Sequence, residues 1–147
     1  MSRLVLRLAI PGIILAIGWV GYQLADVTDC SGPRSDEWAS ATMARLDAAE
    51  TDYNSWNEAA TSYQFTSLAG RAEQRYRAQL GQAHPSCLVE LQNTTAEFFF
   101  SEWKMYEAAG SGDFETAARY DEDSVQAMEA SQREIDTLAV KFDWDIE

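Results

Sequence analysis

The order of hydrophobic and polar positions divides the chain into one uniformly apolar run and a longer part with helical periodicity. The apolar run covers residues 8–25, eighteen positions without an acidic or basic side chain. As a helix with a rise of about 1.5 Å per residue, it spans about 27 Å, close to the bilayer's hydrocarbon core of about 30 Å. The run therefore predicts a single transmembrane helix that anchors the chain.

The charges on either side of this run predict its orientation. Arg3 and Arg7 precede it, and Asp26 and Asp29 follow it. Because positively charged flanks stay on the cytoplasmic side, we expect residues 1–7 to be cytoplasmic. The rest of the chain is then expected outside the cytoplasm, attached to the cell membrane by one span.

Two other interpretations of the N-terminal run remain open. A cleaved signal peptide would have Gln23 and Ala25 at positions −3 and −1, and glutamine is a poor residue at −3. A lipoprotein would use Cys30, but residues 27–29 lack the small side chains expected before a lipidated cysteine. Both alternatives also place the bulk of the chain outside the cytoplasm.

After a short polar linker at residues 26–35, the pattern becomes that of a helix. From residue 36 to about 80, small or apolar residues recur in alternating steps of three and four. Tyr63 belongs to the first stripe of such positions, and a second stripe begins at Phe65. The region fits one long helix, or two helices with a fold-back between Thr61 and Gly70.

Glycine and proline predict where the next helix begins and ends. Gly81 ends the first helical region, and Pro85 is suited to the first turn of the next helix. That helix ends at residues 110–112, Gly-Ser-Gly, with Gly110 expected to take the left-handed conformation that often closes a helix.

A final helix is predicted to follow at once. Asp113 is its expected N-cap, and its stripe of apolar positions continues to Phe142. Residues 143–147 form an acidic tail. Short turns join antiparallel neighbours, so the fold class is all-α, with an antiparallel helical bundle over residues 36–142 behind the anchor.

The two cysteines decide between three and four helices. Outside the cytoplasm, Cys30 and Cys87 are expected to form a disulfide. One unbroken helix over residues 36–80 would span roughly 65 Å, whereas a disulfide requires Cα atoms about 4.4–6.8 Å apart. The disulfide therefore favours a fold-back and four helices, and its absence would permit three.

Charge limits the classes of partner. The chain has 11 basic and 24 acidic residues, a net charge of −13. Such a chain repels nucleic acid and anionic lipid, so its natural partners are cations or proteins with basic or apolar surfaces. A solvated acidic surface that maintains solubility explains the same composition.

The sequence contains no motif for catalysis, a metal ion or a cofactor. His84 is the single histidine, and the spacing of Cys30 and Cys87 fits neither a metal site nor a redox motif. The carboxylates at residues 121–123 point in different directions on a helix, so we interpret them as a solvated face. We expect no catalytic residue, no metal ligand and no cofactor.

The aromatic residues offer the one candidate surface. Three consecutive phenylalanines at residues 98–100 cover most of a helix circumference, so at least one ring must leave the core. We predict an interaction patch of four residues: Phe99, Phe100, Trp103 and Tyr106.

These observations favour a non-enzymatic, membrane-anchored helical bundle that acts as an interaction or accessory subunit of a larger assembly. Gly18 and Gly21 would allow close packing of the anchor against another helix. The alternative is a sensor-like bundle that binds a small ligand or cation in a pocket lined by Trp56, Tyr63 or Trp103. An enzyme of unknown type is the least favoured hypothesis.

Overall fold

The computed structural model describes residues 33–55 and 61–142, and over these residues the protein is all-helical. Its elements are α2 (Pro33–Ser55), α3 (Ser62–Gly81), the short 3₁₀ helix η1 (Ser86–Leu88), α4 (Val89–Gly110) and α5 (Phe114–Phe142). The predicted helical bundle is therefore confirmed, with four long helices rather than three.

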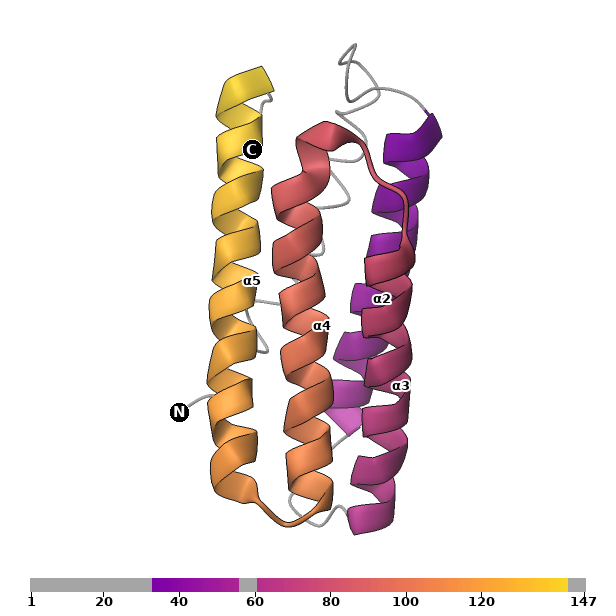
Figure 1. Ribbon diagram of the computed structural model, residues 1–147, viewed down its shortest axis with the longest axis vertical. Helices are drawn as coiled ribbons and strands as arrows, with labels where there is room; N and C mark the ends of the chain where they lie inside the picture. The colour runs from indigo at the N-terminus through magenta and orange to yellow at the C-terminus, as the bar shows by residue number, and fades with distance from the viewer. Residues whose placement is uncertain (1–32, 56–60, 143–147) are drawn as a thin grey trace.

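Successive helices run in opposite directions (Figure 1). Helices α3, α4 and α5 lie side by side, and α2 lies behind α3 and α4 in this view. The start of α2, the connection from α3 to α4 and the end of α5 all lie at one end of the bundle (Figure 1). Short connections between antiparallel neighbours produce this arrangement.

The fold-back lies at the N-terminal edge of the predicted interval. Helix α2 ends at Ser55 and α3 begins at Ser62, so Thr61, the first residue of the interval from Thr61 to Gly70, is the N-cap of α3. The local reason is a capping box: the Thr61 side chain accepts from the amide of Gln64, and the Gln64 side chain accepts from the amide of Thr61. Gly70 lies inside α3 and does not interrupt it.

The predicted ends of the later helices are close to the observed ones. Helix α3 ends at Gly81, and Asp113 caps α5 by accepting a hydrogen bond from the Thr116 amide at 3.1 Å. The left-handed residue between α4 and α5 is Gly112, with φ +83°, and not Gly110 as predicted. Gly110 is instead helical and packs against the start of α3, where a Cβ would lie 3.3 Å from the Cβ of Phe65.

The core contains one stripe of α4 and apolar residues from the other three helices. Along α4, Leu91, Phe98 and Met105 are all buried. The remaining large buried hydrophobic side chains are Trp38, Leu46, Tyr53, Phe65, Leu68, Leu88, Phe99, Tyr106, Met128, Ile135 and Leu138. Burial of this apolar surface is the main favourable contribution to folding.

Candidate interaction surface

Four aromatic rings from three helices form a continuous cluster at the surface of the α3–α4–α5 layer. Phe100 and Trp103 come from α4, Tyr76 from α3 and Tyr120 from α5, and all four are half-buried. The ring centroids of Tyr76 and Trp103 are 6.0 Å apart and stacked, and those of Phe100 and Tyr120 are 6.5 Å apart and nearly perpendicular. We call these four residues the aromatic cluster.

Phe100 makes two further ring contacts within the aromatic cluster. The Phe100 ring lies 5.4 Å from Tyr76 and 6.0 Å from Trp103 between centroids. Phe100 therefore contacts all three other rings and is the centre of the cluster. Tilted and edge-to-face pairs at these distances are the arrangements that aromatic rings favour.

A basic side chain lies on the cluster. The Lys104 ammonium is 4.0 Å from the centroid of the Trp103 ring and 6.0 Å from that of Phe100. Its Nζ also forms an ion pair with Glu107 at 2.7 Å. The cluster therefore already accommodates one cation through cation–π contact, and that cation has its own counter-ion.

The structure corrects half of the predicted interaction patch. Phe99 and Tyr106 are only 0% and 1% exposed, so both belong to the core and cannot contact a partner. Phe100 and Trp103 do reach the surface, and Tyr76 and Tyr120 lie beside them there. The reason is rotational: Phe98 and Phe99 face the bundle axis, which leaves Phe100 as the ring outside the core.

A groove continues from the cluster between α4 and α5. It has a volume of about 420 Å³, and Phe100 and Tyr120 line it together with Glu97 and Asp123. The other lining residues are Ser101, Gln126, Ala127, Ala130 and Arg133. The small side chains among them leave the space between the two helices unfilled.

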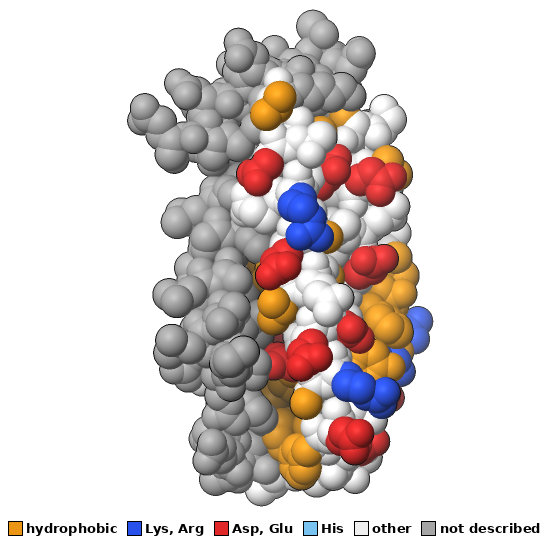
Figure 2. Space-filling model, turned by 90° about the vertical axis from the view of Figure 1, so that its left-hand side faces the viewer, with side chains coloured by type: hydrophobic (Ala, Val, Ile, Leu, Met, Phe, Trp, Pro, Cys, Tyr) orange, Lys and Arg blue, Asp and Glu red, His pale blue; other side chains and the backbone are white. Residues whose placement is uncertain are grey.

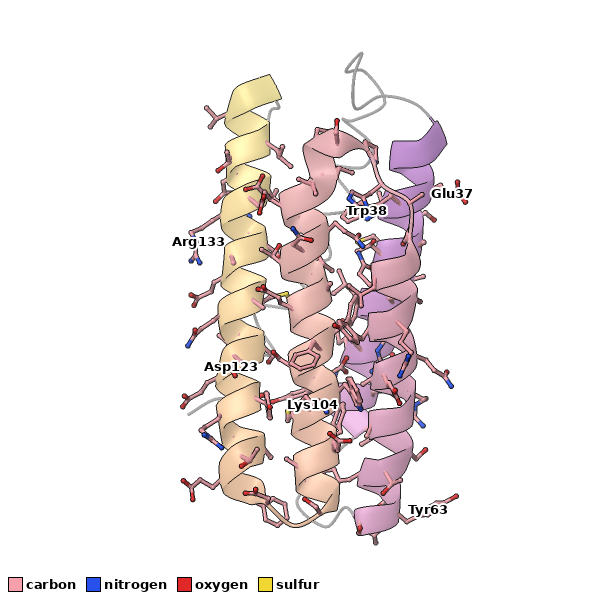
Figure 3. The ribbon with its side chains drawn as sticks, in the orientation of Figure 1. Glu37, Trp38, Tyr63, Lys104, Asp123 and Arg133 are labelled. Atoms are coloured by element: carbon pink, nitrogen blue, oxygen red, sulfur yellow. The ribbon has the colours of Figure 1, made fainter. Side chains whose placement is uncertain are left out.

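Seen from the side of α5, acidic side chains are spread along the face, and hydrophobic ones gather at its right-hand edge and near its lower end (Figure 2). Figure 3 shows that Asp123 and Arg133 belong to α5 and Lys104 to α4. Arg133 forms an ion pair with Glu129 of its own helix at 3.8 Å. Glu97 and Asp123 form no ion pair with any residue that the structure describes.

A buried group of ionic side chains lies between α2, α3 and α4. Arg75 donates to both carboxylate oxygens of Glu102, at 2.8 and 3.3 Å, and to Asp52 at 2.6 Å. Arg71 donates to the same Asp52 carboxylate from its Nε and Nη2 atoms. Two carboxylates thus face two guanidinium groups, so the group is neutral when all four are ionised.

The two carboxyl groups respond differently to burial. Burial alone would raise the pKa of Asp52, but the hydrogen bonds and charges of Arg71 and Arg75 outweigh it and hold that pKa below its usual value. For Glu102, burial has the larger effect and raises the pKa to about 7 despite the opposing influence of Arg75. Glu102 is therefore the carboxyl group whose charge changes near neutral pH.

These groups have the perturbed pKa values that are frequent in active sites, but their bonding argues for a structural role. Arg75 uses three nitrogen atoms on the two carboxylates, and its side chain is 8% exposed. The groove described above is lined by other residues. The Tyr106 hydroxyl is buried without a hydrogen-bond partner among the described residues, and burial holds its pKa well above the usual value.

A second group of polar side chains connects α2 to α3 and α4, near the N-terminal end of α2. The Trp38 indole donates to the Gln92 side chain at 2.6 Å, and Gln79 donates to the same oxygen at 2.7 Å. Gln92 donates in turn to the backbone carbonyl of Gln79. Thr42 of α2 completes the group through its hydroxyl contact with Gln79. Helix α2 is thus held by polar contacts at both ends.

Several predicted residues fall outside the described part of the chain. Cys30, Gly18 and Gly21 are among them, as is the predicted anchor at residues 8–25. Within the described ranges, no helix is long and apolar enough to cross a bilayer. Cys87 is half-buried beside the core and is not a free thiol. Its pairing with Cys30 remains a prediction, as does the anchor.

The structure describes two of the three residues proposed to line a sensor pocket, Tyr63 and Trp103. Tyr63 is 83% exposed at the start of α3, at the far end of that helix from the α3–α4 connection (Figure 3). Trp56 lies outside the described residues, and Trp103 belongs to the aromatic cluster. Trp103 stacks on Tyr76, which follows Tyr63 by thirteen residues, about 20 Å along α3, so Tyr63 and Trp103 are not neighbours. The sensor pocket remains a prediction.

In the part of the chain that the structure describes, neither His84 nor the acidic residues form a recognisable metal centre. The Nδ1 atom of His84 lies 3.2 Å from the backbone oxygen of Gln82, within the connection from α3 to α4. Over residues 33–55 and 61–142, no three His, Cys, Asp or Glu side chains are grouped to hold a metal ion.

Comparison with known proteins adds no function: no protein-family model, no curated protein and no solved structure matches this chain.

Proposed function

We propose that this protein is a non-enzymatic helical bundle that acts as an interaction or accessory subunit of a larger assembly. The observation that carries the proposal is the aromatic cluster of Tyr76, Phe100, Trp103 and Tyr120, which three helices present at one surface. Aromatic residues are enriched at protein interfaces because they bury large areas with little loss of conformational freedom.

The proposal keeps the predicted location. An anchor at residues 8–25 with a cytoplasmic N-terminus attaches the bundle to the outer side of the cell membrane. The net charge of −13 favours a protein partner with a basic surface over nucleic acid or an anionic bilayer. A sensor-like helical bundle that binds a ligand or cation remains the alternative, and the groove beside the cluster supports it.

Site-specific photo-crosslinking in intact cells tests the proposal. The change Tyr120→p-benzoylphenylalanine places a crosslinker on the cluster, and Tyr63→p-benzoylphenylalanine places one on an exposed control position at the far end of α3. We expect a discrete crosslinked protein from position 120 that is absent from position 63. Adding Phe100→Ala should remove this product, because Phe100 is the centre of the cluster.

A stability measurement accompanies the Phe100→Ala variant, so that loss of crosslinking is interpreted only if the bundle remains folded. No crosslinked protein from position 120, or the same products from both positions, would contradict the proposal. A crosslink between two copies of this chain would replace the accessory-subunit hypothesis with self-association.

A further inference from the structure

We propose that the groove between α4 and α5 binds an arginine side chain of the partner protein, with its charge between Glu97 and Asp123 and its stem on the rings of Phe100 and Tyr120. This inference rests on the proposed function, because it names the chemistry of the partner at that same surface.

The antiparallel arrangement of α4 and α5 brings the two acidic residues to the same level. Phe100 of α4 contacts Tyr120 of α5. Glu97 precedes Phe100 by three residues, and Asp123 follows Tyr120 by three residues. Since the helices run in opposite directions, both steps lead the same way by about 4.5 Å along the bundle. One carboxylate from each wall of the groove therefore lies about one turn beyond the aromatic pair.

These two carboxylates are available to an external cation. Neither has an ion-pair partner among the described residues, and both line the groove. Lys104 is already paired with Glu107. Arg133, the basic residue in the lining, follows Asp123 by ten residues, about 15 Å along α5. Arg119, four residues before Asp123, lines an adjoining pocket, donates to the Thr116 hydroxyl and is not in the lining of this groove. The end of the groove nearest the aromatic cluster is thus lined by acidic and not basic side chains.

Arginine fits this combination better than other groups. A planar guanidinium stacks on aromatic rings and donates to two carboxylates at once, whereas an ammonium is a compact point charge. The volume of about 420 Å³ is near the lower limit for small-ligand sites, so the groove suits one long side chain rather than a large ligand. Lys104 on Trp103 shows that rings of this cluster accept a cation.

The same charges argue against two other occupants. A second copy of this chain carries a net charge of −13 and would bring acidic residues toward Glu97 and Asp123. An anionic membrane surface is repelled for the same reason. A basic segment of a different protein is the occupant that the charge of the groove favours.

Titration with short peptides tests the inference on the full chain in detergent micelles. The probe is triarginine, and its control is tricitrulline, which has nearly the same shape without the charge. Binding is followed by the NMR signals of the Ala127 and Ala130 methyl groups, which line the groove. We expect triarginine to shift these signals in a saturable manner and tricitrulline to leave them unchanged.

Two pairs of substitutions separate a specific site from general attraction. Glu97→Gln with Asp123→Asn should weaken triarginine binding about tenfold, because both charge-assisted hydrogen bonds are lost. Asp47→Asn with Glu90→Gln changes the net charge equally at exposed positions on α2 and α4 and should leave binding unchanged. Equal weakening by both pairs would overturn the inference, as would the absence of any shift.

The outcome also distinguishes this inference from the proposed function. If position 120 still crosslinks to a partner but the Glu97 and Asp123 changes affect neither crosslinking nor triarginine binding, the arginine site is wrong and the interaction surface stands. If triarginine binds at the groove but no partner is crosslinked, the accessory-subunit function is wrong. The groove is then a site for small cations.

Discussion

Arg75 and Glu102 join α3 to α4 through two charge-assisted hydrogen bonds inside the bundle, with the guanidinium and carboxylate groups 2.8 Å apart at Nη2 and Oε1. The next residue along each helix, Tyr76 and Trp103, forms the stacked pair of the aromatic cluster. Successive helical residues point about 100° apart, so Arg75 and Glu102 face the interior whereas Tyr76 and Trp103 reach the surface. The buried ion pair and the stacked rings therefore join α3 to α4 at the same level of the bundle.

The buried Glu102 makes the stability of the bundle depend on pH. Its pKa is about 7 in the folded protein and near 4.5 in the unfolded chain. Between these values the folded state holds a proton that the unfolded state has released. Raising the pH through this window should therefore lower the free energy of unfolding, by about 3 kcal/mol in total. Above pH 7 the effect is complete.

Urea unfolding at pH 5 and pH 8 measures this dependence. Glu102→Gln should remove most of it, because glutamine does not titrate, whereas Glu97→Gln at an exposed position of the same helix should preserve it. Equal stability of the unmodified protein at the two pH values would show that Arg75 keeps the Glu102 carboxylate ionised.

Asp52 should be far more important for stability than a surface partner of the same kind of ion pair. Asp52→Asn leaves Arg71 and Arg75 without their shared carboxylate, and we expect it to cost about 3–5 kcal/mol. Glu73→Gln breaks the pair with Arg77, whose side chain is 72% exposed, and should cost at most about 0.5 kcal/mol. Denaturant midpoints compare the two variants, and similar losses would contradict the structural role of the buried group.

Two glycines should respond to alanine in opposite directions. Gly112 has φ +83°, which disfavours any other residue, so Gly112→Ala should destabilise the protein by about 1 kcal/mol. Gly70 is exposed inside α3 and has open space where a Cβ would lie, so Gly70→Ala should stabilise it by about 0.5–1 kcal/mol. Thermal unfolding of both variants checks the signs. A destabilising Gly70→Ala would indicate that this position has contacts beyond helix α3.

A linked pair of cysteine peptides is expected in non-reducing mass spectrometry of membrane-extracted protein. The antiparallel order of α2 and α3 brings the start of α2 to the same end of the bundle as Cys87, which fits a disulfide with Cys30 (Figure 1). Cys87→Ser should then cost about 2–4 kcal/mol, since a disulfide restricts the unfolded chain. Two free thiols would remove the evidence for an oxidising compartment and reopen the orientation of the anchor.

The hydrophobic period and the turn residues were enough to predict an all-helical bundle and most helix ends. Turn and cap residues act on the backbone nearest to them, so their effect can be predicted from the local sequence. Examples are Gly81, the Gly-Ser-Gly turn at residues 110–112 and the Asp113 cap. Gly70 lies inside α3, and the local signal that begins this helix is the capping box of Thr61 and Gln64. Tyr63 and Phe65 both lie in α3, where Tyr63 is exposed and Phe65 is buried, so the second stripe is the one that faces the core.

The candidate surface depended on the tertiary structure. Three consecutive phenylalanines show that one ring must leave the core, but only the neighbouring helices determine that Phe99 is buried and Phe100 is not. The pairing of Arg75 with Glu102 joins residues 27 positions apart. Periodicity and turn chemistry are properties of nearby residues, so the sequence alone determined the helices and their order. Contacts between helices depend on how each is rotated about its axis, and only the folded bundle decided which aromatic and acidic side chains share a surface.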